Sequence, residues 1–517
     1  MGFLLAEVTV AQTQTNAENL ASAAEALKSG RLAEAEKLLR TALERNPKSA
    51  PAHNMLGVAL DQAGRTAEAE QQYQAALRID PESSGAHNNL GNLYLRQRKS
   101  AEARAEFERV LQIDPQHVQA HFNLATLESA AGRFREAAAL FEKLLPISGR
   151  DPTILVPYID AAIRAGLRKE AIEATKELAN QRGIEPRLLF SAGLSFARVG
   201  DYEQAAAVFS RVNELQPHTY EVLYNLGIAL FNLERNEPAS QALAEAADIN
   251  PRPAEVHFRL GLIASEKGDS DNAIEEFRHA VECAPQRPEL HYFLGREYFR
   301  SNFWDGASIE YKKAAELEPK NMNYWLSVGN SNFKKRSFDA ALEAFRRAAS
   351  LEPGALNIHY LLGYGYRAIG NFDAAREELL KQLEVAPDHI DALASLGYVN
   401  LEQGRLEEAE RYLKAVLQRD SEDSGANFDY GRLLIKRKQY DAAAETMRRV
   451  IRLQPDLTQA HYQLFLLYSR TNKPELAQQE LAEFKRLEQF DNQQRSDQAR
   501  LQQIKDMRLG MPVPVGK

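Results

Sequence analysis

The sequence contains a single cysteine, Cys283, so neither an intramolecular disulfide nor a cysteine-based zinc site can form. It has no apolar run near the roughly 18 residues that a membrane-spanning helix needs. It also has no basic excess, because 64 lysines and arginines face 72 acidic residues and the net charge is -8. This balance argues against a nucleic-acid-binding protein, which would carry a basic face or tail. We interpret Cys283 as a packed thiol.

The first residues, MGFLLAEVTVAQTQ, leave two interpretations open. The mostly apolar residues 3–11 end in small side chains, as does the cleavage end of a secretory signal peptide, but no lysine or arginine precedes them. Residues 1–11 are therefore either the remnant of a signal peptide, in a periplasmic or secreted protein, or part of a disordered N-terminus over residues 1–15, in a cytoplasmic one. The sequence does not decide between these compartments.

Internal repetition is the strongest feature of the sequence. Prolines recur at intervals of 34 residues, at Pro47, Pro81 and Pro115 and again at Pro217, Pro251, Pro285, Pro319, Pro353 and Pro387. A frame of 34 residues over 16–491 contains fourteen units without insertion or deletion. Position 20 of the unit is alanine in all fourteen, and position 8 is glycine in ten. A chain of 517 residues is too long for one hydrophobic core, and this period predicts an elongated array.

Each unit has the pattern of a helical hairpin. Positions 1–14 and 18–31 carry apolar residues at helical spacing, and ten units place glycine or asparagine between them, where a left-handed residue can end a helix. Proline then closes most units, because it cannot continue a helix. One hairpin cannot bury its apolar face alone, so the units are expected to stack into a solenoid. Glycine inside a helix costs about 1 kcal/mol, so its recurrence predicts close packing, with positions 8 and 20 facing each other.

This pattern resembles the tetratricopeptide repeat. The matching residues of unit 10 are Trp325, Gly329, Ala341, Phe345, Ala348 and Pro353. The resemblance covers residues 16–491 and implies an all-α fold, a right-handed superhelix of stacked antiparallel helix pairs. It also implies a concave groove, lined by the first helix of each unit, that binds a protein or peptide partner. Unit 5, residues 152–185, is divergent, since Ile159 replaces the glycine and Pro157 lies in the first helix, which we predict to begin near that proline.

The resemblance also indicates which residues face the groove. Position 5 points into it in the family, and positions 9 and 12 flank it with further aromatic residues. The predicted partner-binding residues at position 5 are Asn88, Phe122, Phe190, Tyr224, Phe258, Tyr292, Tyr360, Phe428 and Tyr462. Basic residues recur at position 13, where Arg300 and Lys334 are expected to contact acidic groups of the partner. Aromatic residues beside arginines are typical of binding hot spots.

Seven of the eleven histidines share position 4, which raises the question of a metal site. They are His53, His87, His121, His257, His291, His359 and His461. Equivalent helices lie about 10 Å apart, whereas zinc ligands must all lie within about 2.1 Å of one ion. We interpret these histidines as packing residues and predict neither a metal nor a cofactor. Phosphate-binding loops and nucleophile elbows are also absent from the sequence, so no catalytic residue is predicted.

The sequence therefore predicts a non-enzymatic scaffold for protein–protein interaction. The alternative is a regulatory or targeting subunit of a separate enzyme, such as one acting in cell-envelope or glycan assembly. Residues 1–15 and 492–517 are too few for a catalytic domain. Residues 492–509 are predicted to form a helix that caps the last hairpin, and residues 510–517 a disordered tail. The expected partner is a protein or peptide and not a nucleic acid, no membrane span is expected, and the oligomeric state is not predicted.

Overall fold

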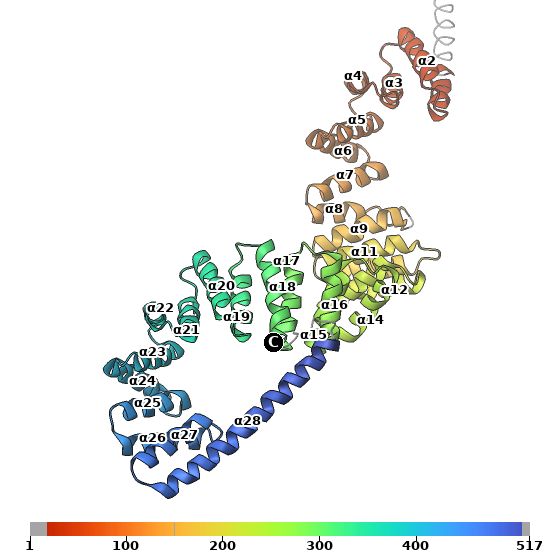
Figure 1. The fold of residues 1–517 in the computed structure, drawn as a ribbon. Helices are drawn as coiled ribbons and strands as arrows, with labels where there is room; N and C mark the ends of the chain where they lie inside the picture. The colour runs from red at the N-terminus through yellow and green to blue at the C-terminus, as the bar shows by residue number, and fades with distance from the viewer. Residues whose placement is uncertain (1–17, 149, 509–517) are drawn as a thin grey trace, which may run out of the picture. The chain divides into compact units, whose positions relative to one another are not determined.

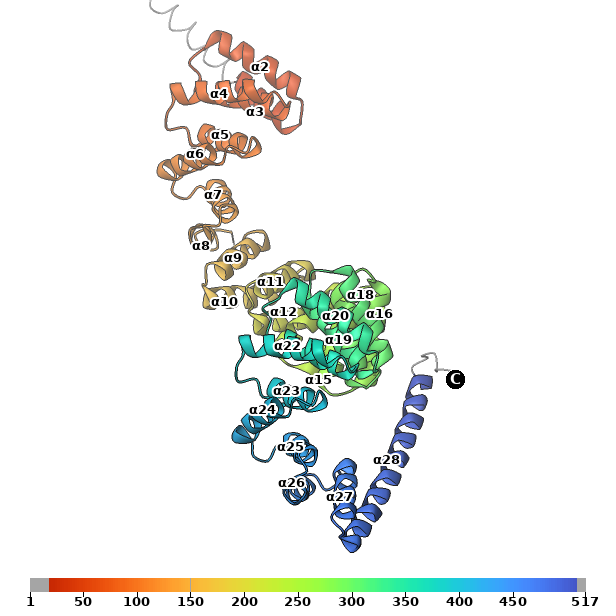
Figure 2. The same ribbon diagram turned by 60° about the vertical axis from the view of Figure 1, so that its left-hand side comes forward.

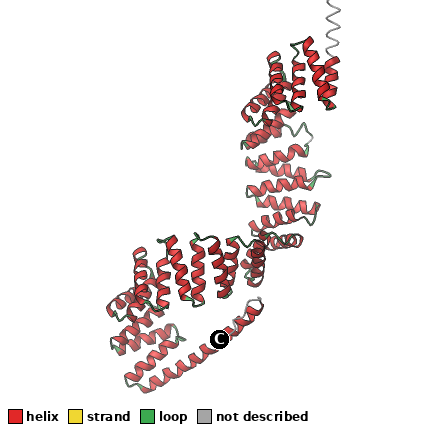
Figure 3. Cartoon of the chain, turned by 45° about the horizontal axis from the view of Figure 1, so that its top comes forward, coloured by secondary structure: helices red, strands yellow, loops and turns green. Residues whose placement is uncertain are grey.

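The computed structural model describes residues 18–148 and 150–508. By its internal contacts the chain divides into two compact units, Met1–Ile263 and Ala264–Lys517. The described residues form helices and turns and contain no strand (Figure 3). No helix in these residues is both long and apolar enough to cross a membrane. Residues 1–15 and 510–517, predicted to be irregular, lie outside the described ranges.

Within each unit the helices follow one another as pairs, here called helix A and helix B of each repeat (Figures 1 and 2). The N-terminal unit contains a helix at residues 18–28, α2 (Leu32–Arg45), α3 (Ala50–Gln62), α4 (Thr66–Ile79), α5 (Ser84–Arg96), α6 (Ser100–Ile113), α7 (Val118–Ala130), α8 (Phe134–Glu142), α9 (Pro152–Arg164), α10 (Arg168–Ala179), α11 (Pro186–Arg198), α12 (Tyr202–Leu215), α13 (Tyr220–Asn232) and α14 (Asn236–Ile249). The boundary between the two units falls within α15 (Ala254–Glu266).

The C-terminal unit continues the same alternation, with helix A carrying odd numbers. Its helices are α16 (Ser270–Cys283), α17 (Pro288–Arg300), α18 (Trp304–Leu317), α19 (Met322–Lys334), α20 (Phe338–Leu351), α21 (Ile358–Ala368), α22 (Phe372–Val385), α23 (Ile390–Glu402), α24 (Leu406–Arg419), α25 (Ser424–Lys436), α26 (Tyr440–Leu453), α27 (Thr458–Arg470) and α28 (Pro474–Arg508). The predicted all-α array of stacked helix pairs is confirmed.

A left-handed residue ends helix A in every repeat. Position 15 has a positive φ, between 56° and 80°, in all fourteen repeats. The N–H of the next residue closes the turn and caps the helix end. In repeat 2, for example, the Arg65 N–H donates to the carbonyl of Leu60, five residues earlier, at 2.8 Å. Ten of these residues are the predicted glycines and asparagines. The other four are Arg98, Glu234, Arg336 and Lys438.

The core of each hairpin is built on the small residues at positions 20 and 8. All fourteen alanines at position 20 are buried. The glycine at position 8, however, lies mainly against the side chain at position 24 of helix B, so the predicted pairing of positions 8 and 20 needs correction. A Cβ on Gly329 would lie 2.2 Å from the ring of Phe345, and one on Gly57 would lie 2.5 Å from Tyr73. Position 20 contributes only its backbone to this contact. For example, a Cβ on Gly363 would lie 3.2 Å from the Ala375 carbonyl oxygen.

Repeat 5 reverses this arrangement. Its helix A carries the large, fully buried Ile159 at position 8, and its helix B carries the small Thr175 at position 24. The prediction that helix A begins near Pro157 is wrong, because α9 begins at Pro152. Asp151 caps that end by accepting a bond from the Thr153 N–H at 2.8 Å, and proline is well suited to the first helical position. Pro157 therefore lies inside the helix, where it removes one backbone hydrogen bond.

Two further helices depart from the regular hairpin. In repeat 4, helix α8 has only 9 residues, against 14 in most other B helices, and turns follow it. In repeat 14, helix α28 has 35 residues and continues without a break past the repeat. Leu487 is buried, but Phe490 is 57% exposed. The described side chains from residue 492 onward are also exposed. The capping role of residues 492–509 stays a prediction. Cys283 is exposed, so its interpretation as a packed thiol is wrong.

Candidate functional site

The position-4 histidines join neighbouring parts of the array by hydrogen bonds. His291 is bonded through Nδ1 to Glu310 of its own helix B at 2.6 Å, and through Nε2 to the carbonyl of Pro285, the last proline of the preceding repeat, at 2.9 Å. His53, His87 and His461 make the same two kinds of contact. These bonds support the packing interpretation. Within the described residues no three histidine, cysteine or acidic side chains gather as metal ligands would.

Two of these histidines have a perturbed protonation equilibrium. The hydrogen bond to Glu106 raises the pKa of His87 although burial opposes it. Burial alone would lower the pKa of His291, but the bonds to Glu310 and to the Pro285 carbonyl outweigh it and the pKa is raised. The pKa of Glu310 is lowered, since its bond to the histidine and the charge of Lys313 exceed the effect of its burial. The pair therefore favours its charged form.

The predicted position-5 residues differ in how much surface they expose. Tyr462 is 40% exposed. Phe258 is only 8% exposed, so it belongs to the core and its prediction as a partner-binding residue needs correction. The partly buried members are Asn88, Phe122, Phe190, Tyr224, Tyr292, Tyr360 and Phe428.

Several of these rings rest on helix B of their own repeat. The Phe190 ring lies 5.4 Å from that of Phe209, and Tyr292 lies 5.6 Å from Tyr311. Tyr292 also contacts Tyr324 of the next helix A at 5.3 Å. The position-5 aromatics thus contribute to packing as well as to the surface, because one side of each ring is covered.

The two predicted basic residues behave differently. Arg300 already has polar partners within the chain. It donates to Ser265 Oγ at 2.8 Å and forms an ion pair with the fully buried Glu297 at 3.3 Å. Glu297 also accepts bonds from Ser265 and Ser270, each at 2.8 Å. Lys334 is exposed and forms no ion pair with any described residue. Of the two, only Lys334 is available to a partner without breaking a contact.

A continuous run of aromatic and arginine side chains crosses helices α19, α21, α23 and α25. We call it the aromatic–arginine ladder, and its members are Phe333, Tyr364, Arg367, Tyr398 and Arg432. Phe333 lies 4.8 Å from Tyr364, and the Arg367 guanidinium lies 4.7 Å from the Tyr364 ring and 5.0 Å from the Tyr398 ring. The Tyr398 ring also has a second guanidinium near it, that of Arg432, at 5.7 Å. Sequence reasoning placed the aromatic members beside the groove but missed both arginines, which occupy positions 12 and 9.

Ion pairs hold the last member of the ladder in place. Arg432 bonds to Glu402 of the preceding helix A at 2.5 Å and to Asp429 at 3.1 Å. Burial raises the pKa of Asp429 although Arg432 opposes the shift. Arg367, by contrast, has no ion pair among the described residues and donates only a long bond of 3.4 Å to Ser395. Its guanidinium is held by two rings while its N–H edge has no carboxylate partner.

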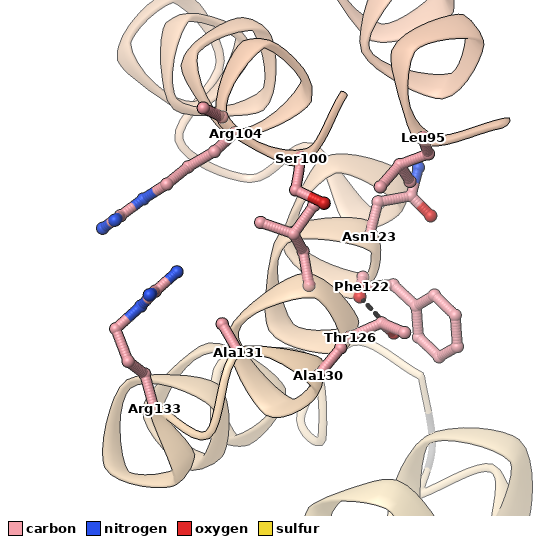
Figure 4. A pocket seen from close by; sticks show the side chains of 11 residues that line it. Leu95, Ser100, Arg104, Phe122, Asn123, Thr126, Ala130, Ala131 and Arg133 are labelled. Carbon is pink, nitrogen blue, oxygen red and sulfur yellow. Dashed lines mark hydrogen bonds between the residues drawn. The ribbon is translucent and has the colours of Figure 1, made fainter. Parts of the chain in front are cut away.

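A cavity of 560 Å³ lies between repeats 3 and 4 of the N-terminal unit. It includes the predicted residue Phe122, whose carbonyl accepts a bond from Thr126 at 2.9 Å (Figure 4). Arg104 and Arg133 extend along its opposite side and both pair with the buried Glu128. Its full lining is Leu95, Ser100, Ala101, Arg104, Phe122, Asn123, Thr126, Leu127, Ala130, Ala131 and Arg133. The arginines are thus already neutralised, which leaves a mainly apolar recess.

Comparisons with known proteins agree on the type of repeat. A tetratricopeptide repeat family model matches residues 20–84, 88–152, 292–355 and 360–424. Two further models with the same description match residues 197–262 and 400–464, and residues 254–287. The comparison with curated proteins found no match.

Solved structures that match the chain share little sequence with it. YrrB, described as a TPR protein with an unusual peptide-binding site, is 22% identical over 36% of this chain and 97% of its own, with a TM-score of 0.34. MamA is 27% identical over 32% of this chain and 92% of its own, with a TM-score of 0.31. Yeast Tom70 is 16% identical over 83% of this chain and 98% of its own, with a TM-score of 0.32.

Proposed function

Because the chain belongs to the tetratricopeptide repeat family, whose repeats serve as protein-interaction scaffolds, we propose that it is a non-enzymatic scaffold that binds a peptide segment of a partner along the helix A surfaces. The binding face is formed by positions 5, 9, 12 and 13 of successive A helices. The position-5 residues of the predicted set, without Phe258, are part of this proposal.

The aromatic–arginine ladder is the observation that carries the proposal. Its five side chains come from four successive A helices, so one extended segment could contact all of them. Tyrosine and arginine are, with tryptophan, the residues most enriched among those that dominate binding energy at protein interfaces, and phenylalanine is enriched in interfaces as well. Their mutual stacking also restricts their rotamers before a partner arrives, which lowers the entropy lost on binding.

The proposal can be tested with peptides selected on the full-length chain from a display library of random 12-residue sequences. Tyr364 and Tyr398 are both replaced by alanine, and the affinity of each selected peptide is measured by fluorescence anisotropy. We expect binding to weaken at least about tenfold, roughly 1.4 kcal/mol. Phe490→Ala removes an exposed aromatic ring outside the face and serves as the matched control.

The stability of the variants separates binding from packing. Amide hydrogen exchange in α21 and α23 should stay within about threefold of the parent chain, because the two tyrosines are partly exposed. If the selected peptides bind the double variant as well as they bind the parent, the face is not the binding site. If exchange instead accelerates by orders of magnitude, the ladder is a packing element.

A further inference from the structure

Several cations on the helix A surface of the C-terminal unit form no ion pair with a described residue. At positions 9, 12 and 13 of α17, α19, α21, α23, α25 and α27 the only acidic residue is Glu402. Five cations at these positions form no ion pair with a described residue: Arg296, Lys334, Arg367, Lys436 and Arg470. This accumulation is notable because the whole chain has a net charge of -8.

The N-terminal unit handles the same positions differently. Its arginines there are paired on the face itself, Arg96 with Asp61, and both Arg164 and Arg198 with Asp160. Each acidic partner also occupies position 9 or 12 of a helix A. The positive face is therefore a property of the C-terminal unit and not of the repeat as such.

The contacts of these cations leave their charges available. The Arg367 guanidinium lies close to two rings, Tyr364 and Tyr398, and forms no ion pair, so its N–H groups can pair with a carboxylate through two parallel bonds. Lys436 donates to the Leu401 carbonyl at 2.6 Å, a neutral acceptor, and is exposed. Lys334 is also exposed. Cations that form no ion pair of their own attract anionic groups.

We propose that the A helices α19 to α25 bind an extended acidic peptide whose carboxylates pair with Lys334, Arg367 and Lys436. This inference rests on the proposed function and adds the chemistry of the partner. Lys334 and Arg367 belong to neighbouring repeats, and Lys436 lies two repeats beyond Arg367. The A helices are about 10 Å apart, and a polyproline-II segment rises about 3.1 Å per residue with three residues per turn, so acidic residues spaced by multiples of three can reach these cations from one face of the peptide.

A single-stranded nucleic acid is a less suitable occupant of this face. Base recognition on such surfaces needs aromatic faces that are free to stack with bases. Here the rings of the ladder lie against one another and against the Arg367 guanidinium, at distances of 4.7 to 5.0 Å to the ring centroids.

The test uses three fluorescein-labelled peptides of 15 residues with the full-length chain. The first has glutamate at every third position and serine or alanine elsewhere, the second has the same composition with its glutamates in one block, and the third has glutamine in place of glutamate. We expect the first peptide to bind at least about tenfold more tightly than the third, and to lose affinity when salt rises from about 50 to 500 mM. Binding of the block peptide should be several-fold weaker than that of the spaced peptide.

Two substitutions connect the effect to this face. Lys334→Gln combined with Arg367→Gln should weaken the spaced peptide about tenfold and leave the glutamine peptide unaffected. Arg449→Gln, an exposed arginine on helix B of repeat 13, is the matched control and should change neither. Unchanged thermal melting of the double variant, expected because neither side chain forms an ion pair, shows that the effect is not unfolding.

Several outcomes would overturn the inference. Equal affinity for the glutamate and glutamine peptides would refute recognition of carboxylates. Equal affinity for the spaced and block peptides would refute the proposed spacing of the acidic residues. Tighter binding of a 15-nucleotide oligothymidine at the same salt concentration would assign the face to nucleic acid. Display-selected peptides that depend on Tyr364 and Tyr398 but lack acidic residues would leave the proposed function intact and refute only the acidic partner.

Discussion

Replacing Gly329 by alanine should destabilise its hairpin, although alanine is the better helix former. The added Cβ would lie 2.2 Å from Cε1 and 2.4 Å from Cδ1 of Phe345. Contacts of that length do not occur between a real Cβ and its neighbours, so the ring or helix α19 must move. Phe345 is fully buried, which leaves the ring no open space to enter.

Two opposing effects set the size of the change. The higher helix propensity of alanine stabilises by about 1 kcal/mol. Overpacking a well-filled core costs about 1–3 kcal/mol, and the short contact places this site at the upper end. We expect a net loss of about 1–2 kcal/mol. The same substitution at Gly85, where the nearest atom is Asn54 Nδ2 at 3.5 Å, should not destabilise its repeat.

Native-state hydrogen exchange followed by mass spectrometry over α19 and α20 is the suitable assay, because a long repeat array does not unfold in one step. Exchange there should accelerate about 5- to 30-fold for a loss of 1–2 kcal/mol. Phe345→Ala removes the obstacle, so adding Gly329→Ala to it should slow exchange. If alanine at 329 destabilises equally in both backgrounds, contact with Phe345 is not the reason for the glycine.

Other features of the fold give further expectations. Arg336→Gly should stabilise its hairpin by about 1 kcal/mol, since a non-glycine residue pays about 1–2 kcal/mol in the left-handed region, and an unchanged melting temperature would contradict this. The raised pKa of His291 adds stability that is complete below its unfolded value near 6.5 and lost as pH rises through the folded value, whereas the lowered pKa of Glu310 makes its contribution disappear only below about 4.5. Exchange protection of α17 should therefore be higher at pH 6 than at pH 8.5, and His291→Gln should abolish the difference. We expect α9 to be the least protected internal A helix, because Pro157 removes a backbone hydrogen bond. Pro157→Ala should restore that bond and slow exchange in α9, and equal exchange rates in the variant and the parent chain would refute this explanation. Deleting residues 492–517 should lower the melting temperature if they cap the array, and an unaltered value would speak against a cap.

The backbone could be predicted from the sequence because the repeat leaves few choices. Ten of the turns contain glycine or asparagine, the residues that adopt the left-handed conformation at the lowest energetic cost, and could therefore be predicted. Arg98, Glu234, Arg336 and Lys438 adopt the same conformation without that signal. Their local preference is overridden by the two helices on either side, whose packing allows only one turn. Single-residue propensity could not have identified these four positions.

The start of α9 was mispredicted for a similar reason. Pro157 by itself suggests a helix start, because proline favours the first turn. Asp151 and Pro152 supply a better start five residues earlier, and the tertiary packing of Ile159 and its neighbours tolerates the missing bond. A local rule failed where a stronger local cap and a buried face acted together.

The candidate site was predicted less well than the fold, because position in the repeat does not determine exposure. Tyr462 and Phe258 share position 5, yet one is 40% exposed and the other 8%. The difference depends on which side chains the neighbouring repeats present, and no single repeat contains that information. The ladder has the same origin, since Arg367 is placed by the tyrosines of two different helices.

Packing and the proposed recognition share the same helix in this protein, and this limits what each can do. The glycine at position 8 lets helix A approach the bulky residue at position 24, and one position further along helix A, position 9, carries a member of the ladder. A change in the depth of that contact would therefore shift Tyr364 and Tyr398 relative to Arg367. In the C-terminal unit the glycine is present in every repeat from 9 to 13, and repeats 10 to 13 carry the ladder and Lys334. Repeats 5 and 14, which replace it with Ile159 and Phe465, contribute no member of the ladder. The regular crossing of the helices thus keeps one cation or ring of the proposed face in register in each of repeats 10 to 13.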